Sequence, residues 1–316
     1  MSADKPIEKS GSMAGSSPVV EMKPAPIESP HRLRRFVLAA GILVLSFAVP
    51  LWELIRFAAT SELYSYILLI PFISFYLMRV KRHGLPDFSP PSKVAAGIFL
   101  AAGLATIAIY CFGLRHKAGL AEDDYVAVMM IAFLLFFFGI CCVFWGIKTL
   151  RAAIFPLGFL IFMVPIPAPA VQEIDSFLQY GSAAAAKGFF WLSGTPFLQD
   201  GLVFQLSDIR MEIAPECSGI HSTLVLFITS LLASYIFLRT PWKRALLTLF
   251  VIPLGLIRNG FRVFTIGQLC VHVGPQMINS PIHRRGGPIF FVLSLVPLFI
   301  LLIVLLKSEK TGEKPK

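Results

Sequence analysis

Eight long apolar segments constrain this chain more than any other feature of its sequence. A helix needs about 20 apolar residues to cross about 30 Å of hydrocarbon, and only 15% of the residues here are charged, with a mean hydropathy of +0.75. A water-soluble domain carries more charge than this. We therefore predict an all-α polytopic membrane protein with about eight transmembrane helices. The predicted spans are 36–55, 63–78, 94–113, 125–146, 152–168, 218–238, 245–270 and 288–306.

The second and fifth of these segments are short and contain prolines, so seven or nine spans are alternatives. The net charge of +10 comes from short basic clusters between apolar segments, a pattern of membrane topology rather than of nucleic-acid binding. Segments predicted on one side hold 19 of the 28 Lys and Arg residues. This bias predicts cytoplasmic termini, with a disordered tail over residues 1–34, a membrane domain over 35–306 and a second tail over 307–316.

The longest loop on the opposite, extracytoplasmic side covers residues 169–216. Its first part, Val171–Leu192, is predicted to form an amphipathic surface helix. The segments Leu202–Leu206 and Ile209–Ala214 then predict a short β-hairpin around Ser207-Asp208, which leads to Cys217. The apolar face predicted for the helix consists of Val171, Ile174, Phe177, Leu178, Ala185, Phe189 and Leu192.

Arginine inside an apolar segment is the first chemical signal. Arg262 lies 17 residues after Ala245, hence about 26 Å along the seventh span, toward its outer end. Arg258 lies one turn earlier on the same face. An arginine within the membrane costs about 3 kcal/mol on insertion scales, so it should face protein or water. A structural arginine paired with a carboxylate or with backbone carbonyls is the alternative interpretation.

A thiol and an imidazole are predicted at the same membrane face. Cys217 lies at the outer start of the sixth span, where a helix N-terminus favours the thiolate. His283 lies in the outer loop after the seventh span, and the rival histidines are His272 and His221. His221 is four residues after Cys217, so we expect both on the same helix face and within reach of each other. Cys217, Arg262 and His283 together fit acyl transfer, with a nucleophile, a proton carrier and a fixed cation for the oxyanion. The alternatives are an unreactive interfacial cysteine and a solvated histidine. The cysteine spacing fits no zinc pattern, and no metal or cofactor is expected.

Three ordered strings resemble the motifs of the exosortase/archaeosortase family. They are Cys217-Ser218-Gly219, Asn259-Gly260-Phe261-Arg262-Val263, and His283 followed by Gly286-Gly287. Similarity extends from roughly residue 35 to 305 and includes segments around Tyr64–Pro71 and Pro156–Pro167. The resemblance implies a membrane cysteine protease-transpeptidase with catalytic Cys217, Arg262 and His283. His221 and Arg258 are additions to that pattern.

The resemblance further implies the substrates and the location. Family members process exported proteins that end in a short motif such as Pro-Glu-Pro, a transmembrane helix and a basic tail. The expected location is the cell inner membrane. The acceptor, either water or an amine, and the oligomeric state stay open. Three rival classes compete with this hypothesis: a transporter with an anion path along Arg258 and Arg262, a non-catalytic assembly factor for exported polysaccharide or protein, and an intramembrane protease.

Overall fold

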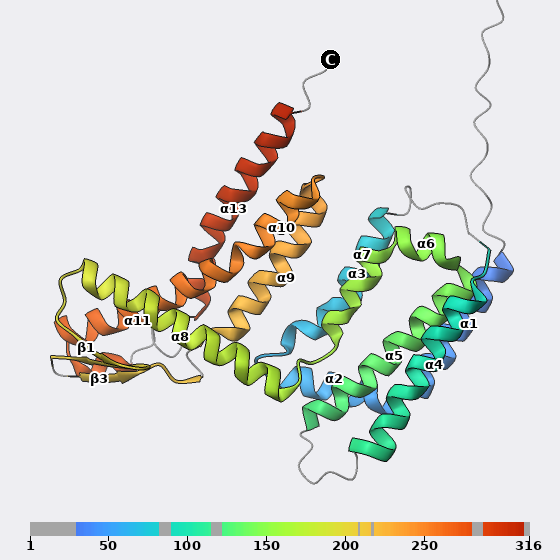
Figure 1. Ribbon diagram of the computed structural model, residues 1–316, viewed down its shortest axis with the longest axis horizontal. Coiled ribbons are helices and arrows are strands. Elements are labelled where there is room, and N and C mark those ends of the chain that lie inside the picture. Colours follow the sequence, from blue (N-terminus) through green and yellow to red (C-terminus); the bar gives the residue numbers. More distant parts are fainter. Residues whose placement is uncertain are drawn as a thin grey trace, which may run out of the picture.

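A computed structural model describes residues 30–81, 90–114, 122–207, 209–215, 218–279 and 287–312. The chain is almost entirely helical, with one small sheet (Figure 1). The elements in chain order are α1 (Pro30–Ser46), α2 (Ala48–Thr60), η1 (Ser65–Leu69), α3 (Ile70–Lys81), α4 (Lys93–Ile109), η3 (Tyr110–Leu114), α5 (Glu122–Phe144), α6 (Gly146–Ala152), α7 (Ile154–Gly158), η4 (Phe159–Met163), α8 (Ala168–Leu192), β1 (Leu198–Asp200), β2 (Val203–Leu206), β3 (Ile209–Glu212), α9 (Ile220–Phe237), α10 (Pro241–Leu249), α11 (Val251–His272), η6 (Pro275–Asn279) and α13 (Gly287–Gly312).

Within these described ranges, five helical segments are long and apolar enough to cross a membrane. Two further pairs pass the same test only together, because α1 and α2 meet at 70° and α6 meets the α7–η4 segment at 78°. Counting each bent pair as one span gives seven. The predicted span at 63–78 is divided between η1 and the 12-residue α3, so the figure of eight is not reached. The all-α polytopic class is confirmed.

The N-terminal half packs around one apolar core formed by α1, α2, η1, α3, α5 and η4, to which α9 adds Ile228. Ile67, Ile70 and Met130 are among its fully buried side chains. Two side-chain hydrogen bonds join the short helices across this core. The Ser74 hydroxyl donates to the Pro156 carbonyl at 2.6 Å, and the Tyr64 hydroxyl donates to the Ile166 carbonyl at 2.9 Å. These contacts hold the broken helices where backbone carbonyls lack helical partners.

The C-terminal half is built from α9, the α10–α11 pair and α13. Leu226, Leu247, Val251 and Leu298 form its centre, and each is less than a tenth exposed. The two halves lie side by side (Figure 1). Exposed apolar side chains are found on the outer surfaces of both. Such exposure is expected where hydrocarbon, not water, surrounds the helices.

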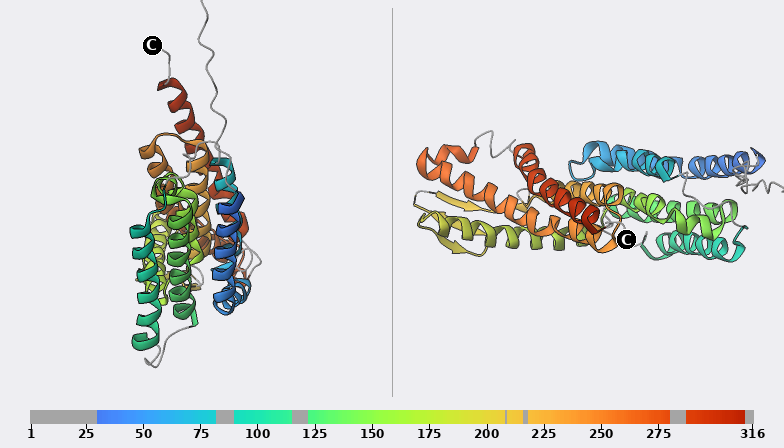
Figure 2. Two further views of the ribbon diagram at one scale, coloured as in Figure 1. Left: turned by 90° about the vertical axis from the view of Figure 1, so that its right-hand side faces the viewer. Right: turned by 90° about the horizontal axis from the view of Figure 1, so that it is seen from above.

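Helix α8 and the sheet form a third layer against α11, and the right panel of Figure 2 shows α8 and α11 lying alongside each other. The strands are antiparallel in the order β1-β2-β3, with Phe204 opposite Met211. Both side chains pack on Phe190 and Ile266. The predicted hairpin is therefore confirmed as β2 and β3, while β1 was not predicted from the sequence.

The apolar face expected for a surface helix over this segment is not the face that α8 buries within the protein. Phe177 is 56% exposed and Leu192 is 74% exposed, as an apolar face that contacts the membrane would be, whereas Leu178 is buried. The buried face instead combines apolar, small and polar residues: Leu178, Gln179, Ser182, Ala183, Ala186 and Phe190. The helix is also longer than a short surface helix, at 25 residues.

The ends of the elements divide between two sides of the molecule. The start of α1, the end of α3, α6, the α9–α10 connection and the end of α13 lie at the upper right of Figure 1, whereas α8 and the sheet lie at the lower left. This separation matches the predicted alternation of loops. Helix α1 begins at Pro30 and α13 continues to Gly312, so regular structure extends beyond both predicted boundaries of the membrane domain.

Candidate functional site

The start of α9 is set by a glycine with a left-handed backbone. Gly219 has φ of +78°, and α9 begins at Ile220. Such a φ favours glycine because a Cβ atom is strained there. Cys217 lies outside the described residues, just ahead of this turn. The described residues on either side of it are hydrogen-bonded to each other, because the Ser218 N–H donates to the Pro215 carbonyl at 3.0 Å.

This turn corrects one inference drawn from the sequence. A separation of four residues would place His221 on the helix face of Cys217. The helix begins only at Ile220, so the helical spacing does not apply across Gly219. Within α9, His221 shares a face with Leu224 and Val225, which pack on the N-terminal core, and its Nδ1 is buried with no hydrogen bond in the described part.

Ser218 is the best-fixed described residue beside Cys217. It is 1% exposed, and its hydroxyl donates to Oδ1 of Asp175 in α8 at 2.5 Å. Its carbonyl accepts a hydrogen bond from Nδ2 of Asn259 in α11 at 3.1 Å. Ser218 therefore connects two helices that are distant in sequence, and sequence reasoning missed the partner in α8.

Gly219 is held from the same side by Arg258. Arg258 Nη2 donates to the Gly219 carbonyl at 3.3 Å and lies 3.1 Å from Thr223 Oγ1. A Cβ atom at Gly219 would lie 3.0 Å from that nitrogen and 3.2 Å from Asn259 Oδ1. Both the backbone angle and the available space thus call for glycine here.

Arg258 is a deeply buried cation whose hydrogen-bond partners, among the residues that the structure describes, are neutral. It is 7% exposed, and its Nη1 is buried without a hydrogen bond in the described part of the chain. Arg262 follows one turn later on the same face and is partly buried. The predicted placement of the two arginines on one face of a continuous helix is confirmed. Two cations within one turn give this part of α11 a strong positive field.

Close packing brings α8 against the segment of α11 that carries Asn259 and Arg262. A Cβ atom at Gly260 would lie 2.5 Å from the Ala185 Cβ and 2.8 Å from the Ala186 nitrogen. Asn259 Nδ2 also donates to the Ser182 hydroxyl of α8 at 3.1 Å. The two backbones can approach this closely because the residues between them are small.

His283 also lies outside the described residues, between η6 and α13. After this segment, the ring of Phe290 in α13 contacts the ring of Phe261 in α11 edge to face, with centroids 6.2 Å apart. Phe261 directly precedes Arg262, so the start of α13 is packed against the arginine segment. The rival His272 is exposed at the C-terminal end of α11.

The described part of the site is therefore a polar junction of α8, α9 and α11. It provides a loop end, directly after Cys217 in the sequence, that is held against α11 by hydrogen bonds from Asn259 and Arg258. The guanidinium N–H groups of Arg258 and Arg262 make this part of α11 rich in hydrogen-bond donors. Among the residues that the structure describes, no three His, Cys, Asp or Glu side chains are grouped as metal ligands would be.

Fold and junction together define a multi-pass membrane protein with a polar site at one end of its helices. The family model for transmembrane exosortases matches residues 57–300, which is well over half of the chain and includes all three motif strings. The chain belongs to the transmembrane exosortase family, and it is a sorting-related membrane protein. No curated protein and no solved structure matches it.

Proposed function

We propose that the protein is a membrane cysteine peptidase-transpeptidase that cleaves C-terminal sorting signals of exported proteins. Cys217 is the nucleophile, Arg262 binds the oxyanion and His283 transfers protons. The site faces the extracytoplasmic side of the cell inner membrane, with both termini in the cytoplasm. The substrates end in a short motif such as Pro-Glu-Pro, an apolar helix and a basic tail.

The reaction proceeds in two halves. The Cys217 thiolate attacks the scissile carbonyl, and the Arg262 guanidinium donates hydrogen bonds to the oxygen that becomes negative. His283 gives the proton taken from the thiol to the leaving amine, and the C–N bond breaks. Water or an amine acceptor then attacks the thioester and His283 takes its proton. The C–S bond breaks, and His283 gives this proton to the departing sulfur, which restores the Cys217 thiol.

The contact network between the Cys-Ser-Gly segment and α11 carries this proposal. Ser218 and Gly219 accept hydrogen bonds from Asn259 and Arg258, the residues that directly precede Gly260-Phe261-Arg262. A loop beside a thiol is thus held against a helix that carries an arginine, across about 40 intervening residues. Fixed geometry of this kind is what converts an encounter into an efficient attack.

The layout of the helices gives further support. The junction is formed by α8, the start of α9 and the middle of α11, away from α6 and the end of α13 (Figure 1). A substrate helix that lies in the bilayer beside these spans would present the residues preceding it at this end. Attack at the interface, rather than at the bilayer centre, disfavours the intramembrane protease alternative.

The test uses a reporter protein with an export signal, a Pro-Glu-Pro motif, an apolar helix and a basic tail, co-expressed with each variant. Cys217→Ser should accumulate full-length reporter while reaching the membrane at wild-type level. Cys111→Ser is the matched control, because Cys111 is a partly exposed free cysteine in a different helix. Cleavage by Cys217→Ser at the wild-type rate would remove the nucleophile and favour a transporter or an assembly factor.

A further inference from the structure

Helix α8 presents a polar stripe to the segment that contains Cys217. Asp175, Gln179 and Ser182 are spaced by four and three residues, so their side chains share one face of the helix. Gln179 is 7% exposed and Ser182 is fully buried. Polar side chains on a buried helix face need hydrogen-bond partners, since desolvation without them is costly.

The partners of this stripe lie on both sides of Cys217. Gln179 Nε2 donates to the carbonyl of Ile213 at 3.3 Å, which fixes the chain as it leaves β3. Asp175 Oδ1 accepts from the Ser218 hydroxyl at 2.5 Å, which fixes the chain before α9 begins. One turn of α8 therefore holds the two ends of the segment between Ile213 and Ser218.

The contact with Asp175 is the more specific of the two. The Ser218 hydroxyl that donates to Asp175 also accepts the Ile220 N–H at 3.3 Å, so the carboxylate orients a group that reaches the first residue of α9. A hydrogen bond to an ionised acceptor is shorter and stronger than a neutral one. A neighbouring carboxylate on the same helix, Glu173, is exposed and has no such role.

We propose that Asp175 is a positioning residue for the peptidase reaction, acting through Ser218 to hold Cys217 at the attack distance. This inference rests on the proposed function of Cys217. In this role Asp175 acts through the Ser218 hydroxyl and not on the substrate, so its removal should lower kcat and leave KM nearly unchanged. Misplacing a reacting group by about 1 Å can lower a rate by about 100-fold.

The experiment is a double-mutant cycle on purified full-length protein in detergent, using the reporter's C-terminal segment as substrate. Asp175→Ala and Ser218→Ala should each lower kcat by about 10- to 100-fold. The double variant should be no worse than either single variant, because both changes remove the same contact. Asp175→Asn keeps an acceptor oxygen and should recover most of the activity. Glu173→Gln is the matched control and should behave as wild type.

A second readout measures position rather than turnover. The rate at which a small iodoacetamide modifies Cys217, followed by peptide mass spectrometry, should change by the same factor in Asp175→Ala and Ser218→Ala and remain unchanged in Glu173→Gln. If Asp175→Ala fails to fold, Asp175→Asn and Ser218→Ala still complete the comparison.

The outcomes separate the two proposals. Normal kcat in both alanine variants, or fully additive losses, would overturn the positioning role, as would an Asp175→Asn variant as impaired as Asp175→Ala. Cleavage by Cys217→Ser at the wild-type rate in the same assay would instead overturn the proposed role of Cys217 as the nucleophile.

Discussion

At the scale of single residues, two arginines one turn apart have different surroundings. Arg258 is buried and bonds a carbonyl and a hydroxyl of the α9 turn through one nitrogen. Arg262 is partly buried on the same face, nearer the end of α11. In the proposed mechanism, Arg258 holds the loop and Arg262 acts on the substrate. The two therefore make a natural pair for comparison.

Arg262→Lys should lower kcat by at least about 100-fold, which is typical of losing one oxyanion donor. A point charge cannot reproduce the two parallel hydrogen bonds of the guanidinium fork. Arg258→Lys should be much milder, because lysine keeps the charge and can supply the one donor now used toward Gly219. The measurement is the initial cleavage rate of each variant, normalised to the amount of folded protein, and the two losses are compared. Equal losses would contradict the division of roles.

Residue spacing allowed part of the site to be predicted, and tertiary contacts decided the rest. The shared face of Arg258 and Arg262 followed from their separation of four residues in a long apolar segment. His221 was misplaced because the left-handed turn at Gly219 ends the helical spacing ahead of α9. Asp175 was missed because its contact with Ser218 spans 43 residues, and no local pattern reports such a contact.

At the scale of elements, the crossing of α8 and α11 depends on small residues. The backbone of α8 approaches Gly260 so closely that a single added methyl group would meet both a side chain and the backbone. Gly260 lies in α11, whereas Gly188 lies in α8 and has open space where a Cβ atom would be. Both glycines lie within helices, but only Gly260 is closely surrounded by other atoms. Alanine substitutions at the two positions therefore test whether the close approach of α8 and α11 stabilises the protein.

Gly260→Ala should destabilise the protein by about 1–3 kcal/mol through overpacking, despite the better helix propensity of alanine. Gly188→Ala should be neutral or slightly stabilising, since alanine is favoured over glycine by about 1 kcal/mol in a helix. Thermal unfolding in detergent, followed by size-exclusion fluorescence, compares the two. A Gly260→Ala variant that unfolds at the wild-type temperature would show that α8 and α11 do not need this contact.

The same crossing explains why the residues that α8 buries against the protein could not be predicted from its apolar pattern. In water, the apolar face of a helix turns inward. Beside a membrane, large apolar side chains such as Phe177 can face hydrocarbon, while small and polar residues pack against a neighbouring helix. Long spans were predictable because composition alone sets them, whereas the bends near Phe47 and Ala153 depend on packing and left no signal in the apolar pattern.

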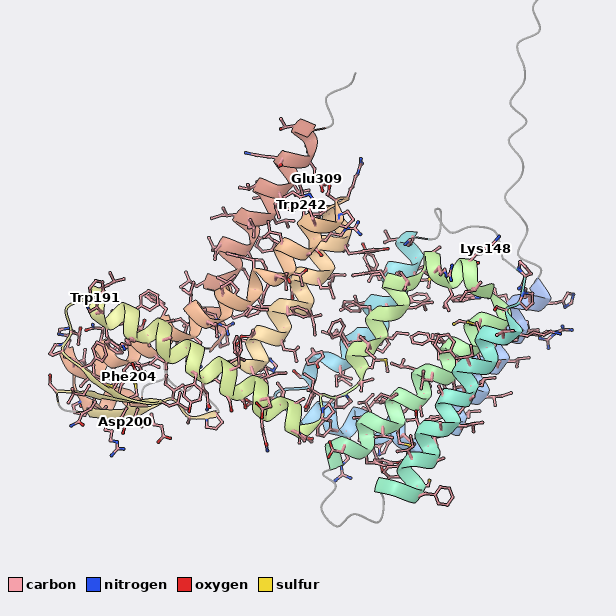
Figure 3. All side chains as sticks on the ribbon, in the orientation of Figure 1. Lys148, Trp191, Asp200, Phe204, Trp242 and Glu309 are labelled. Atoms are coloured by element: carbon pink, nitrogen blue, oxygen red, sulfur yellow. The ribbon has the colours of Figure 1, made fainter. Side chains whose placement is uncertain are left out.

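At the scale of the whole molecule, the helices define two ends. Lys148 in α6 and Asp200 at the end of β1 lie at opposite ends in Figure 3, and both are exposed. The basic clusters of the sequence predict that the Lys148 end faces the cytoplasm. The proposed chemistry requires Cys217 at the Asp200 end, where an exported substrate would arrive.

Sided labelling of Cys217 tests this arrangement most directly. A membrane-impermeant maleimide is applied to spheroplasts and to inverted vesicles, and modification is followed at position 217, with Asp200→Cys and Lys148→Cys as references for the two sides. We predict that Cys217 and the position 200 cysteine react in spheroplasts, and that the position 148 cysteine reacts only in inverted vesicles. Modification of Cys217 only from the cytoplasmic side, together with position 148, would contradict the proposed site.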